Sequence, residues 1–356
     1  MSKKRIVFTG GGSAGHVTPN IAIINELNKS EWEISYIGSK KGIEKELIEK
    51  QGTPYFGISS GKLRRYFDFE NFIDVFKVLK GCFGARRILK KLKPQLVFSK
   101  GGFVSVPVIL AAKSLSIPIC IHESDITPGL ANKISQRFAT RIYTSFEEAT
   151  KFFPKNKTKT IGSPIRKELY NGTAQKGREF LGYTSKLPIL TIMGGSLGAK
   201  KINETVRGAI NELTSKYQIV HLCGKGNLDE SLLHQKNYKQ FEYLHDELAD
   251  ILAATNIVIT RGGSNSIFEF LALNIPMIII PLSRNQSRGD QILNGKSFEK
   301  KGYAIMLEEE NLDDRKLLDD LEMLTHDQES FKTAMKLALQ SDALDVLVKE
   351  INEGLK

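Results

Sequence analysis

The sequence predicts an α/β fold made of two doubly wound, Rossmann-like domains. Short apolar segments alternate with amphipathic segments along the chain, a pattern typical of parallel strands connected by helices. Glycine-rich turns follow apolar segments in both halves of the chain, and each turn precedes a helical segment. A length of 356 residues suits two domains of ordinary size.

The domain boundary is expected near residue 162. The segment Gly162-Ser163-Pro164 interrupts the alternation of strands and helices at the middle of the chain, where the charge balance also changes. Residues 329–353 read as one long amphipathic helix that can tie the domains together. We therefore expect an N-terminal domain over 1–162, a C-terminal domain over 163–340, and a C-terminal helix over 341–356 that can return to the N-terminal domain.

The composition, with 41% hydrophobic and 26% charged residues, is that of a globular protein able to bury full cores. The basic start of the chain precedes only Ile6-Val7-Phe8, which is too short for a secretory signal, and no apolar stretch approaches the roughly 18 residues that span a bilayer. Cys82, Cys120 and Cys223 form no C-x-x-C pair, so neither a disulfide framework nor a zinc site is predicted. The protein is expected to stay in the cytosol.

Positive charge is concentrated in the first half of the chain. Residues 1–160 contain 27 Lys and Arg against 13 Asp and Glu, whereas residues 161–356 contain 24 against 27. This asymmetry indicates a domain that faces a polyanion, either nucleic acid or an anionic membrane surface.

The segment 61–93 combines ten basic and three acidic residues with six aromatic ones. Basic residues beside exposed aromatic residues are typical of an element that binds a membrane surface. Residues 63–69 read as an exposed loop, through which we expect the first domain to bind anionic bilayers. Four apolar residues further along recur at helical spacing and are expected to face the core instead: Phe72, Val75, Phe76 and Leu79.

The first glycine turn, Gly10 to His16, follows the predicted strand 5–9 and precedes a predicted helix over 18–27. Residues 10–15 match G-x-G-x-x-G, the pattern of dinucleotide-binding turns. The next strand, 34–37, ends in Gly-Ser-Lys-Lys without the acidic residue that binds the ribose of NAD, which at best suits a 2′-phosphate. An NADP-binding oxidoreductase is therefore one alternative.

A second turn of this kind opens the stretch 260–281. The apolar segment 257–259 leads into Gly262-Gly263, and Ser264 or Asn265 suits the N-cap of the following helix. Unpaired N–H groups at a helix start, together with the helix dipole, favour a bound phosphate. Glu269 follows one and a half turns later, where a carboxylate can accept hydrogen bonds from the two hydroxyls of a ribose.

Other polar residues come directly after predicted strands. His122 to Gly129 follow the strand 117–121, Gly101-Gly102-Phe103 follow the strand 96–99, and a further glycine turn at 194–198 follows the strand 187–193. Residues 287–294 begin a helix whose polar groups can join the nucleotide pocket. Because ligands bind at the carboxyl ends of parallel strands, these segments are candidates for a binding site.

Seven motifs in order resemble the MurG family of peptidoglycan N-acetylglucosaminyltransferases, and the resemblance extends from end to end of the chain. The motifs are Gly11-Gly12-Ser13-Ala14-Gly15-His16-Val17, Lys100-Gly101-Gly102-Phe103-Val104-Ser105-Val106-Pro107, His122-Glu123, Gly129-Leu130-Ala131-Asn132-Lys133, Met193-Gly194-Gly195-Ser196-Leu197-Gly198-Ala199, Arg261-Gly262-Gly263-Ser264 and Asp290-Gln291. The resemblance implies the two-domain GT-B glycosyltransferase architecture with a deep interdomain cleft.

The resemblance also implies the reaction. N-acetylglucosamine passes with inversion from UDP-N-acetylglucosamine to the 4-hydroxyl of the muramoyl sugar of undecaprenyl-diphospho-N-acetylmuramoyl-pentapeptide. No metal or cofactor is implied, and the sequence contains no Asp-x-Asp metal clamp. The implied partners are these two substrates and an anionic membrane surface rather than nucleic acid, which places the protein peripherally on the cytoplasmic side of the cell membrane. A GT-B lipid glucosyltransferase is the alternative within the same architecture.

Site residues follow by position from the resemblance. The donor nucleotide would be held by Arg166, Ser196, Leu244, Ser264, Asn265, Ser266, Ile267, Phe268, Glu269 and Gln291. The transferred sugar would meet Ser13, Ala14, Gly15 and Asp125. The sequence departs from the family in two places, with Ser-Ala-Gly at 13–15 where Thr-Gly-Gly is common, and Asp125 where many relatives have Asn.

Inversion by single displacement needs a base for the proton of the attacking hydroxyl, and His16 and Asp125 are the two candidates. Histidine has a reference pKa of about 6.5, close to working pH. An aspartate, at about 3.9, is a weak base unless desolvation raises its pKa. His16 has a second interpretation, in which it anchors the turn or binds the acceptor diphosphate as a cation.

Overall fold

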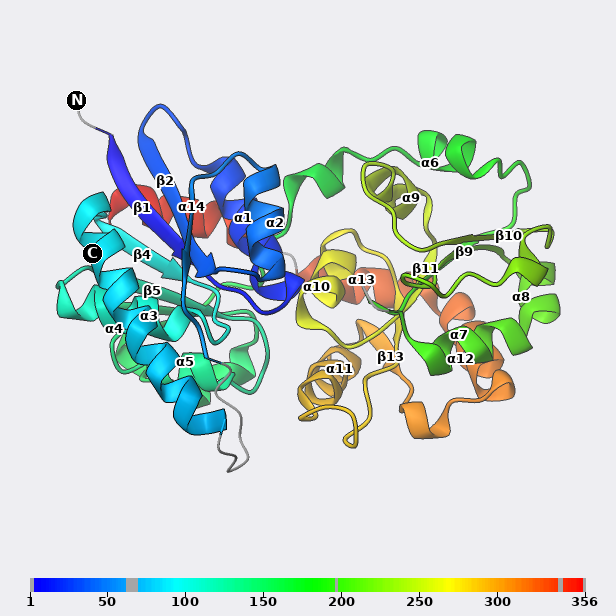
Figure 1. Ribbon diagram of the computed structural model, residues 1–356. Coiled ribbons are helices and arrows are strands. Elements are labelled where there is room, and N and C mark those ends of the chain that lie inside the picture. Colours follow the sequence, from blue (N-terminus) through cyan, green and yellow to red (C-terminus); the bar gives the residue numbers. More distant parts are fainter. Residues whose placement is uncertain (1–2, 62–69, 196–197, 339–341, 355–356) are drawn as a thin grey trace. The chain divides into compact units, whose positions relative to one another are not determined.

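In the computed structural model the chain forms two compact units, and the structure describes residues 3–61, 70–195, 198–338 and 342–354 (Figure 1). Unit 1 comprises Met1–Pro164 and Ser341–Lys356, and unit 2 comprises Ile165–Gln340. Each unit is an α/β body around one parallel sheet, as the alternation of apolar and amphipathic segments predicted.

Unit 1 is built on a seven-stranded parallel sheet of order β3-β2-β1-β4-β5-β6-β7. Its strands are β1 (Lys4–Thr9), β2 (Trp32–Ser39), β3 (Tyr55–Ile58), β4 (Leu96–Ser99), β5 (Ile119–Glu123), β6 (Arg141–Thr144) and β7 (Thr158–Thr160). Its helices are α1 (Thr18–Glu26), α2 (Ile43–Lys50), α3 (Glu70–Leu92), α4 (Ser105–Ser114), α5 (Leu130–Ser135) and α14 (Ala343–Glu353), with short 3₁₀ turns η1 (Ala14–His16), η2 (Glu147–Phe152) and η3 (Lys155–Lys157).

Both faces of this sheet are buried. Along β1, Ile6 and Phe8 belong to one core cluster, and Val7 belongs to the cluster on the opposite face. Successive side chains of a strand point to opposite faces, so a strand covered on both sides reads as a continuous apolar run. The run Ile6-Val7-Phe8 is such a strand.

Helix α14 is part of unit 1 although it ends the chain. Leu344 and Leu347 are fully buried in the cluster that contains Ile6 and Phe8. Two polar contacts add to this packing: the Trp32 indole N–H donates to Asn352 Oδ1 at 2.7 Å, and the Tyr143 hydroxyl donates to Glu350 at 2.8 Å. The C-terminal segment is therefore held by unit 1 through apolar and polar contacts.

The prediction of one long helix over 329–353 was wrong. Two helices occupy this region, α13 (Gln328–Ala338) and α14. Asp342 has an extended backbone and its carboxylate accepts from the N–H of Leu344 at 2.8 Å, so a new helix begins there. Amphipathic periodicity runs through both segments, but an N-cap aspartate separates them.

Unit 2 has a six-stranded parallel sheet of order β10-β9-β8-β11-β12-β13. Its strands are β8 (Ile189–Met193), β9 (Gln218–Leu222), β10 (Tyr238–Phe241), β11 (Ile257–Thr260), β12 (Met277–Ile279) and β13 (Ala304–Met306). Its helices are α6 (Ala174–Leu181), α7 (Lys200–Gly208), α8 (Ile210–Lys216), α9 (Leu248–Ala254), α10 (Ser264–Ala272), α11 (Asp290–Lys300), α12 (Asp314–His326) and α13, with 3₁₀ turns η4 (Lys167–Asn171), η5 (Glu230–Leu232) and η6 (Glu309–Asn311).

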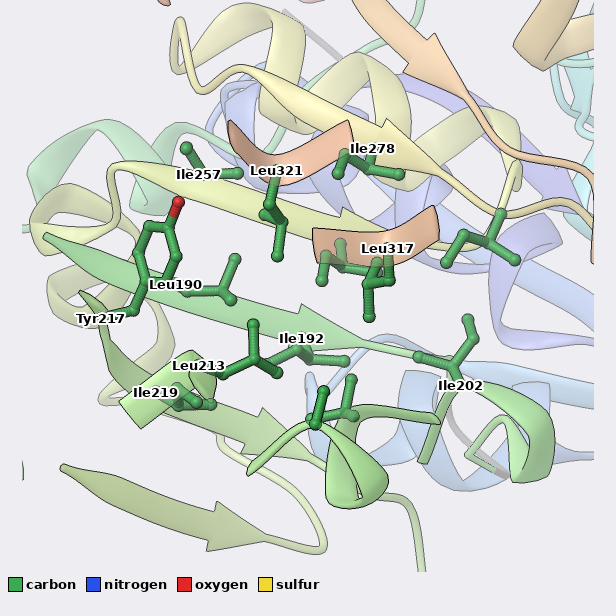
Figure 2. Packing of buried hydrophobic residues seen from close by; sticks show 14 of the residues in the cluster. Leu190, Ile192, Ile202, Leu213, Tyr217, Ile219, Ile257, Ile278, Leu317 and Leu321 are labelled. Carbon is green, nitrogen blue, oxygen red and sulfur yellow. The ribbon is translucent and has the colours of Figure 1, made fainter. Parts of the chain in front are cut away.

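A large core cluster lies on one face of this sheet. Figure 2 shows Leu190 and Ile192 of β8 meeting Leu213 of α8, with Leu317 and Leu321 of α12 over the neighbouring strands. These aliphatic side chains have almost no exposed surface. Burial of this kind is the main stabilising contribution to the unit, and it leaves the strand ends and their turns as the polar part of the sheet.

Each sheet has one point at which the strand order reverses. In unit 1 this point lies between β1 and β4, and in unit 2 it lies between β8 and β11. In doubly wound sheets, ligands bind outside the carboxyl ends of the strands at this point. Four glycine turns lie at such positions. They are the turns after β1 and β4 in unit 1, and the turns after β8 and β11 in unit 2.

Helix α3 has an apolar outer face, which differs from the prediction. Phe76 and Leu79 are 71% and 50% exposed, and Phe83 is 75% exposed, so the expectation that Phe76 and Leu79 face the core was wrong. The inner face of the helix carries Gly81, Ala85 and Leu89, which are buried. Periodicity identified an amphipathic helix but not the side that packs, because apolar residues lie on both sides. The side chains at positions 72 and 75, and the loop 63–69, lie outside the described residues.

Within the described part of the chain, none of the helices has the length and apolarity needed to cross a bilayer.

Candidate functional site

The turn after β11 opens the site of unit 2. Helix α10 begins at Ser264, and its N-cap is Gly263, with an extended backbone and no side-chain cap. The prediction that Ser264 or Asn265 caps the helix was therefore wrong, because the chain enters helical geometry one residue earlier. The first three N–H groups of the helix, those of Ser264, Asn265 and Ser266, have no acceptor within an α-helix and form an anion-binding end.

A buried arginine holds this turn in place. Arg261 forms an ion pair with Glu309 at 2.5 Å, and it donates to the carbonyl oxygens of Ile280 and Pro281 at 3.2 and 3.4 Å. Its guanidinium therefore binds a carboxylate and two backbone carbonyls of the protein itself. A charge this deeply buried requires such partners. Sequence reasoning did not identify Glu309, which lies 48 residues away in η6 and carries no local signal.

Helix α11 supports the same turn from another side. Asn294 Nδ2 donates to the Gly262 carbonyl at 3.1 Å. A Cβ at Gly262 would lie 2.5 Å from the Gln291 carbonyl, so only glycine allows the helix this close. The Gln291 side chain, predicted to hold the nucleotide, accepts from the Leu282 N–H at 3.0 Å and is therefore fixed at the edge of the site.

Glu269 and Arg166 are paired. Arg166 donates through Nε at 3.1 Å and lies with Nη2 at 3.0 Å from the same oxygen, Oε1 of Glu269. Burial raises the pKa of Glu269 and the neighbouring Arg166 opposes that shift, so the ion pair favours the carboxylate form. The structure thus brings together two residues, 103 positions apart, that were both assigned to the donor nucleotide.

The remaining residues assigned to the donor differ in their surroundings. Ile267 is fully buried in the core, so it can meet a nucleotide only through its backbone. Phe268 lies edge-to-face against Phe298 with ring centroids 5.3 Å apart. Leu244 packs against the core cluster beside β9 and β10. Ser196, in the turn after β8, lies outside the described residues.

In unit 1, His16 closes the first glycine turn. Its Nδ1 lies 3.0 Å from Ser13 Oγ and 3.1 Å from the Gly11 carbonyl oxygen. Because a carbonyl oxygen can only accept, the contact with Gly11 favours the tautomer with the proton on Nδ1. The lone pair of the neutral ring is then on Nε2. Ala14 and Gly15, assigned to the transferred sugar, form η1 with His16.

A buried carboxylate lies behind this turn. Glu44, in the first turn of α2, accepts from the Gly12 N–H at 3.2 Å and from the Ser39 N–H at 3.0 Å. It is 1% exposed, and a Cβ at Gly11 would lie 2.5 Å from its Cδ. A negative group bound to the turn N–H does not suit the pyrophosphate of a dinucleotide, which argues against the NADP alternative. Sequence reasoning missed Glu44, although it is the first acidic residue after β2.

The glycine turn after β4 contacts the glycine turn after β1. A Cβ at Gly102, whose φ is +83°, would lie 2.1 Å from the Gly11 carbonyl oxygen, so both turns depend on glycine here. Lys100, at the start of the second turn, donates its backbone N–H to the Thr9 carbonyl at 3.1 Å. The turns after β1 and β4 therefore form one continuous edge.

The turn after β5 is organised by Glu123. Its Oε1 accepts from the Asp125 N–H at 3.1 Å, and its Oε2 accepts from the Gly129 N–H at 3.1 Å and from Asn132 Nδ2 at 2.9 Å. Asp125 is half-buried in this turn, and β5 is separated from β1 only by β4. Adjacent strands are about 4.8 Å apart, so the turns that carry Asp125 and His16 lie at the same sheet edge, two strand spacings apart.

Across the described ranges, no group of three or more His, Cys, Asp or Glu side chains is arranged to hold a metal ion.

Comparison with known proteins identifies the family. Residues 6–144 match the glycosyltransferase family 28 N-terminal domain, and residues 189–350 match the glycosyltransferase family 28 C-terminal domain. Among solved structures, MurG of Acinetobacter baumannii is similar with a TM-score of 0.79 and 24% identity, covering 99% of this chain and 100% of that one. The glycosyltransferase of kitacinnamycin is similar with a TM-score of 0.76 and 14% identity, over the full length of both chains. Both similarities concern the fold, and they confirm the predicted GT-B architecture.

Similarity to curated proteins is closer. A protein of Bacillus cereus strain ATCC 14579 named UDP-N-acetylglucosamine–N-acetylmuramyl-(pentapeptide) pyrophosphoryl-undecaprenol N-acetylglucosamine transferase 2 is 58% identical, covering 99% of this chain and 100% of its own length. A transferase of Shouchella clausii, with the same name apart from the numeral, is 55% identical over 99% of this chain and 100% of its own. The chain therefore belongs to glycosyltransferase family 28.

Proposed function

We propose that the protein transfers N-acetylglucosamine from UDP-N-acetylglucosamine to the 4-hydroxyl of the muramoyl sugar of undecaprenyl-diphospho-N-acetylmuramoyl-pentapeptide, in peptidoglycan synthesis. The observation that carries this proposal is the 58% identity, over the full length of both chains, to a transferase named for this reaction. The matched region covers 99% of this chain, so it spans both glycine turns of unit 1 and the α10 turn of unit 2.

The donor site is assigned to unit 2. The N–H groups at the start of α10 lie at the positive end of the helix dipole, which suits the diphosphate. Arg166 supplies a cation for the same diphosphate, and Glu269 supplies a carboxylate for the ribose hydroxyls. In the structure these two side chains bind each other, at 3.0 Å, so both are already held at the site. Donor binding exchanges this contact for contacts with the nucleotide.

The acceptor site is assigned to unit 1. The 4-hydroxyl of the muramoyl sugar attacks the anomeric carbon of N-acetylglucosamine on the face opposite to UDP. A new C–O bond forms, the bond to the UDP oxygen breaks, and the hydroxyl proton passes to a base, so the configuration inverts. His16, with its lone pair on Nε2, is the first candidate for this base, and Asp125 is the second. The leaving UDP is stabilised by Arg166 and the α10 dipole rather than by a metal.

UDP release tests the proposal. With UDP-N-acetylglucosamine present, we expect release of UDP only when the polyprenyl-diphospho-muramoyl-pentapeptide is added, and no release with diacylglycerol. Release with diacylglycerol instead would favour the lipid glucosyltransferase. Thermal unfolding separates the remaining alternative, because UDP and not NADP is expected to raise the unfolding temperature.

We also assign membrane binding to helix α3, at the cytoplasmic leaflet. Phe76, Leu79 and Phe83 follow each other at helical spacing, and each is at least half exposed. Exposed basic residues accompany them on the same helix and at its end, namely Lys77, Lys80, Arg87, Lys90 and Lys91. An apolar stripe with flanking positive charge suits an interface of acyl chains and anionic headgroups, and the +7 balance of residues 61–93 agrees with this assignment.

Replacing Phe76 and Phe83 together by serine is expected to lower binding to vesicles of anionic phospholipid by at least tenfold. Each phenylalanine contributes about 1.5–3 kcal/mol when fully buried, and partial insertion of two rings retains a large part of this. Co-sedimentation with the vesicles measures this loss of binding. Added salt should also weaken the binding of the wild-type protein, because it screens the basic residues. Leu233→Ser is the matched control, since Leu233 is 57% exposed in unit 2. Equal binding by the double variant and the control would place the membrane surface elsewhere.

A further inference from the structure

Lys100 is a buried lysine in the turn after β4. Its side chain is among the largest that are fully buried, at 2% exposure, although it carries a basic group. Its Nζ lies 2.6 Å from His122 Nδ1 and 2.6 Å from Ser124 Oγ, both in the segment at the end of β5. A buried ammonium is costly unless it has hydrogen-bond partners, and these two side chains supply them.

The hydrogen-bond directions in this cluster follow from the chemistry of its members. His122 Nε2 lies 3.1 Å from the Gly162 carbonyl oxygen, which can only accept. His122 therefore carries its proton on Nε2, its Nδ1 accepts, and Lys100 donates to it. Lys100 thus connects the turn after β4 to His122 at the end of β5. His122 in turn contacts the chain just beyond β7, so three strand ends at one edge of the sheet are joined.

The charges around Lys100 are acidic. The carboxylates of Glu123 and Asp125 favour its charged form. Burial lowers the pKa of Lys100 and the two carboxylates partly offset this, so that the pKa lies at about 7. Burial, and after it the Asp125 carboxylate, raise the pKa of Glu123 to about 7. Without the ammonium, two like-charged side chains would share one turn.

We propose that Lys100 is a positioning residue of the acceptor side: by donating to His122 and Ser124, it holds the turn that carries Asp125 in place for the transfer reaction and keeps a positive charge beside that turn. The inference rests on the proposed function. Lys100 itself, being buried, is not assigned a contact with either substrate.

Lys100→Met keeps the length of the side chain and removes its charge. We expect kcat to fall by about tenfold or more, with the affinity for UDP unchanged within twofold, because the donor site is in the other unit. The acidic side of the pH profile of kcat should move to higher pH whether His16 or Asp125 is the base, since loss of a nearby positive charge favours the protonated form of either group. Lys113→Met, which removes an exposed lysine of α4 in the same unit, should leave both kcat and the profile unchanged.

A purely stabilising lysine would behave differently. Its loss would lower the folded fraction and the amplitude of activity, without moving the profile along the pH axis. An unmoved profile in a folded Lys100→Met variant therefore overturns the proposal.

A second measurement does not depend on activity. With lysine labelled at Cε, carbon NMR should show one lysine that titrates near pH 7 and is absent from Lys100→Met. Asp125→Asn should move this midpoint downward, because the Asp125 carboxylate raises the pKa of Lys100. This variant keeps the native lysine, so the test survives if Lys100→Met fails to fold.

A midpoint that Asp125→Asn leaves in place would overturn the coupling on which the proposal depends. Absence of transferase activity in the wild-type protein would instead overturn the proposed function, while the NMR titration would still decide whether Lys100 and Asp125 are coupled.

Discussion

Replacing His16 by alanine is expected to lower kcat by about 10²–10⁴-fold and to leave the affinity for UDP unchanged. General base catalysis contributes a factor of this size, and the nucleotide site is assigned to the other unit. The structure supports this role because the Nδ1 contact with the Gly11 carbonyl, at 3.1 Å, favours a lone pair on Nε2. His326→Ala is the matched control, since this histidine is exposed in unit 2 and is assigned no function.

The size of this loss does not identify the base, because a histidine that only anchors the turn is also needed for activity. The pH dependence of kcat separates the two roles. If His16 is the base, the acidic limb of the wild-type profile disappears in His16→Ala, since the residual rate no longer depends on a neutral imidazole. Persistence of that limb in His16→Ala, together with its loss in Asp125→Asn, would instead assign the base to Asp125.

Replacing Glu269 by alanine is expected to weaken UDP binding by about 1.5–3 kcal/mol, roughly 10–150-fold, the value of a hydrogen bond to a charged group. Titration calorimetry with UDP measures it. Because Glu269 also binds Arg166 in the structure, the variant loses a ribose partner and leaves Arg166 without its carboxylate. Glu269→Gln keeps the shape and one acceptor oxygen, so it should lose less.

Comparison of UDP with 2′-deoxy-UDP separates these two consequences. The wild-type protein should prefer UDP, because the 2′-hydroxyl donates to Glu269, and this preference should disappear in Glu269→Ala. Arg166→Ala should lower the affinity for both nucleotides equally and retain the preference for UDP. If Glu269→Ala binds UDP as the wild type does, the carboxylate has no part in the donor site.

The sequence predicted the architecture because periodicity is a local property. Strands buried on both faces read as apolar runs, and the segment 96–99 was predicted with the bounds that the structure has. Glycine turns after β1 and β11 predicted candidate ligand sites, since the carboxyl ends of parallel strands form one edge. The order of seven motifs indicated the family, and the family comparison confirmed it.

Local patterns failed where a choice depended on distant parts of the chain. Spacing marked α3 as amphipathic but not which face packs, and Phe76 proved to lie on the outer face. Asp342 divides what reads as one helix, because its carboxylate caps the second helix while periodicity continues on both sides.

By itself, the sequence determined the fold class, the presence of glycine turns in both units and the residue types available at each. Only the tertiary structure decided which of these residues act on each other. The ion pair of Arg166 with Glu269 joins positions 103 apart, and that of Arg261 with Glu309 joins positions 48 apart. Lys100 is an ordinary lysine in the sequence, and its burial against His122 exists only because β4 and β5 are neighbours in the sheet. Burial and pairing are properties of the assembled chain, and they set the ionisation of these groups.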